Sequence, residues 1–162
     1  MSRTDADLQH LLLREDNTVD WKAGGDPAKI AKTLAAFAND HQRSGGGSVL
    51  CGVAEEIETG QPRLRGLDST QIRQLRDQVL NWCRGRVSPP LSIQTEQVTL
   101  HDQPELSILL FHCSASAEIH RLEHKIPIRV DDRVIDARDP EIAALYRRKG
   151  AVHFLEQPQP GA

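Results

Sequence analysis

Apolar residues recur every three or four positions in four segments of the chain, a spacing typical of amphipathic helices. The second segment carries the clearest start signal, because Asp26 can cap a helix and Pro27 suits its first position. Its apolar stripe ends near Asn39 or Asp40. The predicted helices span residues 5–13, 27–39, 69–84 and 139–149.

Shorter apolar or alternating runs predict strands between these helices. In Thr18–Lys22, Val19 and Trp21 face one side, and Asp20 and Lys22 face the other. The predicted strands span residues 18–22, 48–53, 92–100, 106–113, 126–130 and 134–137, with a hairpin loop at 101–104 and pairing between the last two. We therefore expect an α/β (α+β) fold with a mixed β-sheet flanked by helices, as one domain over 1–153 with a flexible tail at 154–162.

Composition narrows the class of protein. The 162 residues are 38% apolar and 27% charged, and no apolar run is long enough to span a membrane. The N-terminus lacks the apolar core of a secretion signal, so we expect a cytoplasmic protein without a membrane partner. Cys51, Cys83 and Cys113 are widely spaced, which predicts buried reduced thiols and neither disulfides nor structural zinc.

The net charge of −3 does not by itself indicate a nucleic-acid-binding protein. A local basic face is nevertheless sufficient for binding, and basic residues do gather in two regions. A solvated helix face is the more common explanation of each cluster taken alone. The clusters are Arg73, Arg76, Arg84 and Arg86, and then Arg147, Arg148 and Lys149.

Three acidic residues occupy the ends of predicted strands. Glu15 precedes the first strand, Asp20 lies within it, and Glu55 follows the buried run that ends at Val53. Their carboxylates meet if the first two strands are neighbours, and a divalent cation such as Mg²⁺ or Mn²⁺ would offset their repulsion. Lys22 shares the face of Asp20 and could hold a phosphate or an attacking water. Spacing alone favours a solvated rim with ordinary salt bridges.

Several ordered motifs add to this pattern. The chain resembles the Schlafen AlbA-like domain family in these motifs, over roughly residues 10–150. They are Glu15 followed by Asp20-Trp21-Lys22, Ala36-Phe37-Ala38-Asn39, Gly46-Gly47, Gly52-Val53 with Glu55, Gly66-Leu67, and Ile128-Arg129-Val130.

The resemblance implies a mixed α/β domain that binds nucleic acid. In Schlafen proteins that cut RNA, three carboxylates carry metal-dependent cleavage, and they correspond to Glu15, Asp20 and Glu55 here, with Lys22 in support. The hypothesis is an endoribonuclease that uses Mg²⁺ or Mn²⁺ on structured RNA such as tRNA, with RNA favoured over DNA. Those proteins enclose RNA between two lobes, so a homodimer is expected. Asp20 and Glu55 differ in side-chain length from the family pattern, and Asp131 replaces a glycine.

Basic residues would contact the nucleic acid. They are Arg129, Arg84, Arg86, Arg121 and Lys125. Two other functions stay open: a non-catalytic DNA- or RNA-binding module of a regulatory or defence system, in which the carboxylates are remnants, and a protein-interaction domain.

Other motifs are weaker. His120 to His124 has the H-x-x-E-H form of a zinc protease motif, but Pro127 follows too soon for the helix that motif needs. The glycines at 45–47 precede a strand instead of a helix, which favours a turn over a phosphate loop. Asn39 could cap the helix end or orient Glu15 or Glu55.

Overall fold

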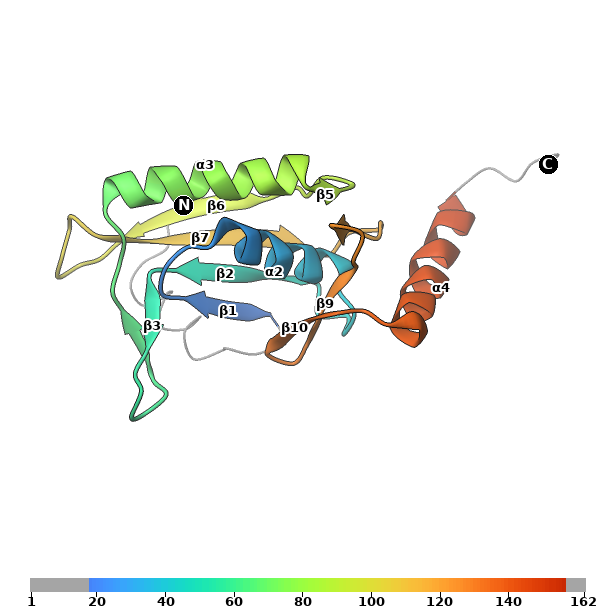
Figure 1. Cartoon of the computed structure of the whole chain (residues 1–162), viewed down its shortest axis with the longest axis horizontal. Helices are drawn as coiled ribbons and strands as arrows, with labels where there is room; N and C mark the ends of the chain where they lie inside the picture. The colour runs from blue at the N-terminus through green and yellow to red at the C-terminus, as the bar shows by residue number, and fades with distance from the viewer. Residues whose placement is uncertain (1–17, 157–162) are drawn as a thin grey trace.

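A four-stranded sheet forms the centre of the molecule, and the computed structural model describes residues 18–156 (Figure 1). Its strand order is β1-β2-β7-β6, with β1 parallel to β2 and the other neighbours antiparallel. This mixed sheet with flanking helices confirms the predicted α+β fold. The strands are β1 (Val19–Lys22), β2 (Gly46–Cys51), β6 (Gln94–Thr99) and β7 (Ser107–Ser114).

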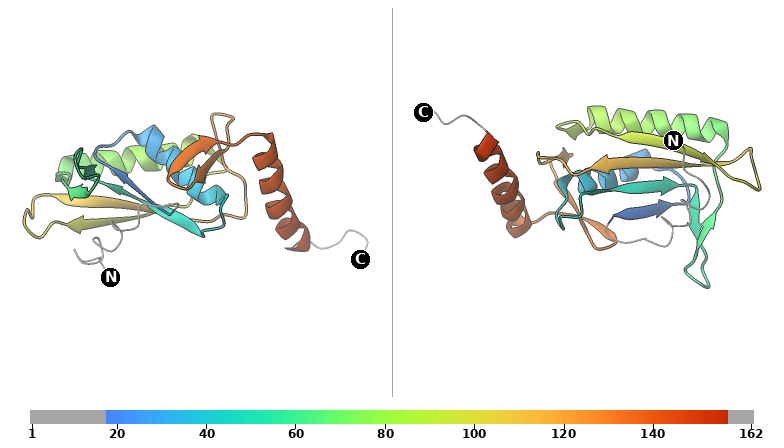
Figure 2. Two further views of the ribbon diagram at one scale, coloured as in Figure 1. Left: turned by 90° about the horizontal axis from the view of Figure 1, so that it is seen from below. Right: turned by 180° about the vertical axis from the view of Figure 1, so that it is seen from behind.

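Two helices cover the same face of this sheet, as the view from below shows (Figure 2). They are α2 (Pro27–Asn39) and α3 (Ser69–Gly85). Their apolar stripes pack on Val49, Phe111 and the neighbouring sheet residues to form the main core. A second buried cluster, which includes Leu50 and Leu110, lies on the opposite face of the sheet. A third helix, α4 (Asp139–Glu156), leaves the body at one end (Figure 1).

Three short two-stranded ribbons complete the described part of the chain. The ribbon β3–β4 lies at one end of the molecule, and β5, β9 and β10 lie toward the other (Figure 1). All three ribbons are antiparallel. Their strands are β3 (Val53–Glu55) with β4 (Pro62–Leu64), β5 (Val87–Ser88) with β8 (Arg121–Leu122), and β9 (Pro127–Val130) with β10 (Arg133–Asp136).

Side-chain caps start the two covering helices where the sequence predicts. Asp26 Oδ1 accepts hydrogen bonds from the backbone N–H of Ala28 at 3.0 Å and Lys29 at 3.4 Å. Asp68 and Gln71 form a reciprocal capping box at the start of α3. Each cap satisfies backbone donors that a helix start leaves without partners.

Three features differ from the sequence-based prediction. The predicted strand at 48–53 is interrupted at Gly52, whose φ of +100° ends β2 and starts β3 in a new direction. The strands β4, β5 and β8 were not predicted, because two or three residues carry no periodic pattern. The last helix continues to Glu156, beyond the predicted end and into the predicted tail. The predicted helix at 5–13 lies outside the described residues.

The glycines at 45–47, at the start of β2, make a turn and a close contact, and they do not form a phosphate loop. Gly45 has a φ of +90° and Gly46 a φ of +109°, as the predicted turn requires. A Cβ at Gly47 would lie 2.4 Å from the Phe37 ring. The small residue therefore lets α2 pack directly on the sheet.

The three cysteines are free and buried, as predicted. Burial raises the pKa of Cys51 to about 12, that of Cys83 to about 12 and that of Cys113 to about 11. They are protonated at neutral pH and are poor nucleophiles or metal ligands. Within residues 18–156, no helix combines the length and the apolar character needed to cross a membrane.

Asn39 at the end of α2 joins three backbone groups from the distant C-terminal part of the chain. Its side-chain nitrogen donates to His120 O at 3.0 Å and to Pro127 O at 2.8 Å. Its side-chain oxygen accepts from His120 N at 2.7 Å. Asn39 is fully buried, so its role is to attach β8 and β9 to α2.

Two cations of α4 dock this helix on the C-terminal end of α2. Arg148 donates to Asn39 O at 3.0 Å and to His41 O at 3.4 Å. Lys149 donates to Ala38 O at 3.2 Å and also to Glu118 O. Cations are favourable at a helix C-terminus, where carbonyl groups lack partners. Burial lowers the pKa of Lys149 to about 8, which agrees with a structural role.

The variant Asn39→Ala should be strongly destabilised, because it leaves three buried backbone groups without partners. We expect a loss of about 3 kcal/mol or more in the free energy of unfolding, measured by urea denaturation. Asn81→Ala removes an exposed asparagine of α3 and should change the stability by less than about 0.5 kcal/mol. Equal stabilities of the two variants would contradict this role of Asn39.

Candidate nucleic-acid interface

The first strand brings Asp20 and Lys22 to one side of the sheet edge, as predicted. Pairing of β1 with β2 makes these strands neighbours, which was the condition for the proposed carboxylate site. Lys22 Nζ lies 2.9 Å from Asp20 Oδ2. This contact is ionic and lacks hydrogen-bond geometry, since the same oxygen has no hydrogen-bond partner among the described residues.

Arg129 of β9 lies inside the molecule, which corrects its predicted role as a nucleic-acid contact. Its side chain is 4% exposed. It donates to Val19 O at 3.1 Å and to Asp20 Oδ1 at 3.4 Å, and its guanidinium lies 5.1 Å from the centre of the Phe37 ring. A buried cation needs such partners to offset its lost hydration. Arg129 therefore attaches β9 to β1 and α2.

Both oxygens of Asp20 thus face cations from this chain. Glu55 is exposed at the end of β3, on the hairpin with β4, and Glu15 lies outside the described residues. Among residues 18–156, no group of three acidic, histidine or cysteine side chains could hold a metal ion. The donors that the structure does describe therefore do not by themselves fit a divalent cation.

The two segments that carry four of the predicted nucleic-acid contacts lie side by side at the other end of the molecule. Pairing of β5 with β8 places Ser88 opposite Arg121 and Val87 opposite Leu122. Arg86 directly precedes β5, so the end of α3 lies beside the segment that carries Arg121 and Lys125. We call this surface the basic face; it comprises Arg84, Arg86, Arg121, His124, Lys125 and Arg138.

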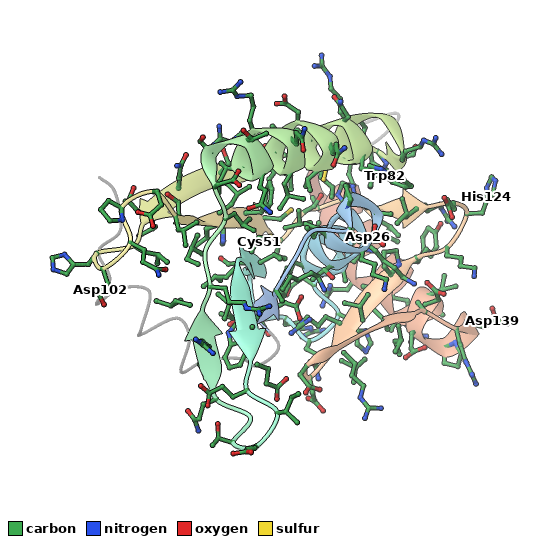
Figure 3. The ribbon with its side chains drawn as sticks, turned by 60° about the vertical axis from the view of Figure 1, so that its left-hand side comes forward. Asp26, Cys51, Trp82, Asp102, His124 and Asp139 are labelled. Carbon is green, nitrogen blue, oxygen red and sulfur yellow. The ribbon has the colours of Figure 1, made fainter. Side chains whose placement is uncertain are left out.

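The basic face is open and well anchored. Trp82 and His124 mark it along one side of the molecule, away from the loop at Asp102 (Figure 3). The guanidinium of Arg86 lies 5.1 Å from the centre of the Trp82 ring, which holds its charge at the surface. Arg121 is half-buried and donates to the Tyr146 hydroxyl of α4. All basic side chains of the face except Arg121 are exposed.

A shallow groove of about 820 Å³ lies along part of the basic face. Arg121, His124, Lys125 and Arg138 line it, with the apolar Ile135. Asp136 and Glu141 also line the groove and reduce its positive charge in part; Asp136 lies 3.7 Å from Lys125 and 3.2 Å from Lys32 of α2. Backbone-binding surfaces combine such basic side chains with a groove.

Arg138 and the groove were not predicted from the sequence. Arg138 stands alone in the sequence between Ala137 and Asp139, with no cluster to mark it. The H-x-x-E-H segment forms a turn, because Glu123 and His124 have φ values of +51° and +70°. That backbone is not helical, so the zinc protease motif is excluded, as expected.

The β3–β4 end of the molecule carries a slight excess of acidic side chains. Glu55, Glu56 and Glu58 gather at this hairpin, beside Arg63 and Arg65. This hairpin is therefore less favourable to a polyanion than the basic face.

The architecture and the basic face define an α+β domain of a nucleic-acid-related class. The family model Schlafen, AlbA_2 matches residues 15–138. The chain belongs to this family, which confirms the resemblance noted in the sequence motifs. No curated protein matches the chain at the sequence level.

Two solved structures are similar in fold. The N-terminal domain of an ATP-dependent DNA helicase RecG-related protein from Nitrosomonas europaea has a TM-score of 0.55 and 21% identity, over 70% of this chain and 74% of that chain. The DIP2311 protein from Corynebacterium diphtheriae has a TM-score of 0.47 and 19% identity, over 82% of this chain. This chain spans 24% of the length of that protein.

Arg129→Ala should affect stability, whereas Arg86→Ala should not. The first change leaves Asp20 and Val19 O without a buried partner, which should cost about 3 kcal/mol or more. The second removes an exposed side chain and should cost less than about 1 kcal/mol. Urea denaturation of both variants measures the difference. Arg129→Ala with wild-type stability would show that this arginine is not a structural residue.

Proposed function

We propose that this chain is a nucleic-acid-binding module that holds a phosphate backbone on the basic face. The observation that carries the proposal is the convergence of Arg84, Arg86, Arg121 and Lys125, which come from two distant segments joined by the β5–β8 pair. Family membership supports the same role. The sequence alone ranked cleavage first, but Asp20 is engaged by Arg129 and Lys22, so binding ranks first here.

Contacts between basic side chains and phosphates act through charge. Arginine and lysine neutralise phosphates and release counterions, so affinity falls as salt rises. The groove of the basic face is open and shallow, which suits a single strand or a shape-recognised RNA better than base-pair reading in a major groove. We therefore propose RNA over DNA as the ligand. A homodimer also stays a prediction.

Removal of two charges from the basic face should weaken binding and reduce its salt dependence. We expect Arg84→Ala combined with Lys125→Ala to lower the slope of log affinity against log salt by about 1.4, at roughly 0.7 per phosphate contact on a single strand. Fluorescence anisotropy with a labelled single-stranded RNA at several salt concentrations measures this slope. Both residues are exposed, so the fold should be retained.

The matched control removes two exposed arginines from the β3–β4 end. Arg63→Ala combined with Arg65→Ala makes the same change in net charge and should leave the slope unchanged. An equal loss in both double variants would mean that binding follows net charge and not the basic face. Wild-type protein that binds neither RNA nor DNA at low salt would refute the proposal.

We propose metal-dependent RNA cleavage as the second candidate function. The observation that favours it is the position of Asp20 and Lys22, side by side on β1 next to β2. Glu15, Asp20 and Glu55 would supply the carboxylates for Mg²⁺ or Mn²⁺. When bound, such an ion activates water and stabilises charge on a phosphodiester. Lys22 would hold the phosphate, and Asp20 would have to release Arg129 or Lys22 to bind an ion.

Glu55 provides the cleanest test of cleavage, because it is exposed and supports no buried contact. If the second candidate holds, cleavage of labelled tRNA requires added Mn²⁺ or Mg²⁺, is lost in Glu55→Gln and is retained in Glu58→Gln on the same hairpin. Gel electrophoresis of the RNA with metal or with chelator gives the readout. Intact RNA in every wild-type reaction would leave only the binding function.

A further inference from the structure

A cavity of about 280 Å³ lies next to the segment that precedes Arg121, and the proposed binding function does not use it. It forms where the end of β7, the segment after β5 and the segment before β8 meet. Its volume is near the lower end for small-molecule pockets, roughly 300 Å³. The lining includes Leu91, Ser92, Gln94, Ser114, Glu118 and His120.

His120 is among the residues that line this cavity, and its ring carries an unused hydrogen-bond acceptor. Its Nδ1 lies 2.7 Å from Pro89 O, and a carbonyl oxygen only accepts, so Nδ1 carries the proton. In the neutral ring, Nε2 then has a free lone pair. This nitrogen is buried, and it has no hydrogen-bond partner among the described residues. The whole side chain is only 3% exposed. Buried acceptors are normally satisfied, so a donor is expected here.

Burial also keeps this ring neutral. It lowers the pKa of His120, against a smaller opposite effect of the Pro89 hydrogen bond, and the nearby Lys149 lowers it further. Nε2 is therefore an acceptor at physiological pH. A ligand group that donates an N–H fits this nitrogen, whereas an anion does not.

The remaining walls suit a flat group. Ala38 and Cys113 are buried apolar residues of the lining, and Leu91 is half-buried. Hydroxyl and amide groups of Ser92 and Gln94 are exposed on the same lining. Apolar walls with a few polar groups are the features that hold a base taken out of its stack.

The position of the cavity connects it to the bound strand. His120 immediately precedes Arg121, and the segment with Leu91 and Ser92 follows β5, which itself follows Arg86. Phosphates held by Arg86 and Arg121 would therefore lie near residues of the cavity wall, although neither arginine is part of that wall. A base attached to such a phosphate needs to leave its stack and turn inward to reach His120.

We propose that this cavity receives one unpaired nucleobase of the bound strand, which donates an N–H to His120 Nε2 after a rotation of the ring uncovers this nitrogen. The inference rests on the proposed binding function and adds a structural preference to it. A base within a duplex is stacked and paired, so only single strands, bulges and loops can supply this base at low cost.

Two RNA hairpins test the inference. They have the same sequence and a one-nucleotide bulge, which carries its base in one hairpin and is abasic in the other. We expect wild-type protein to bind the first hairpin about tenfold more tightly by fluorescence anisotropy, in line with the contribution of a base held by protein. Both hairpins carry the same phosphates, so the backbone contribution cancels.

Cavity variants locate the difference. Ser92→Tyr places a ring in the cavity from an exposed position and should make the two affinities equal, with the abasic hairpin bound as by wild type. Thr95 is exposed on β6 and does not line the cavity, so Thr95→Tyr should keep the tenfold difference. His120→Phe removes the acceptor and should also remove the difference, and thermal unfolding checks that each variant is folded.

The outcomes separate this inference from the proposed function. Equal, salt-dependent affinities of wild type for the two hairpins would show that only water occupies the cavity; the inference would fail and the binding function would stand. A preference that persists in Ser92→Tyr would place the base elsewhere and also overturn the inference. No binding of either hairpin would refute both.

Discussion

The side chain of Asn39 is the contact on which the functional end of the molecule depends. It ends α2 in the middle of the core and forms three hydrogen bonds to backbone groups of His120 and Pro127. These bonds hold the strands β8 and β9 against α2. The basic residues Arg121 and Lys125 lie between those two anchoring points, so their position follows from this one buried amide.

Basic residues of this chain divide into two groups with different roles. Arg129, Arg148 and Lys149 are turned inward, where they satisfy Asp20, the carbonyl groups at the end of α2 and the Glu118 carbonyl. The residues of the basic face keep their charge at the surface and are the ones available to phosphates. The net charge of −3 conceals this arrangement, because a sum over the whole chain does not show where basic side chains gather.

Local signals explain why much of the fold could be predicted from the sequence. The cap formed by Asp26 and Pro27, the alternation in β1 and the hairpin between β6 and β7 all depend on residues close in sequence, and the structure contains each of them. The β5–β8 pair could not be predicted, because its strands are two residues long and far apart.

The site was also predictable only in part, because the segments that form it are far apart in the sequence. The segments that carry four basic residues of the predicted interface do meet, but only through that unforeseen strand pair. Arg129 was predicted to contact nucleic acid but is buried, since its partners Val19 and Asp20 lie 110 and 109 residues away. Nothing in its own neighbourhood marks a buried cation. Asn39 was noticed in a family motif, but its partners are equally distant.

Photo-crosslinking of a bound single-stranded RNA, followed by mass spectrometry of the peptides, identifies the surface that holds the strand. We expect crosslinked peptides from residues 82–92 and 119–126, the segments joined by the β5–β8 pair. Crosslinks concentrated at residues 55–65, on the β3–β4 hairpin, would contradict this expectation.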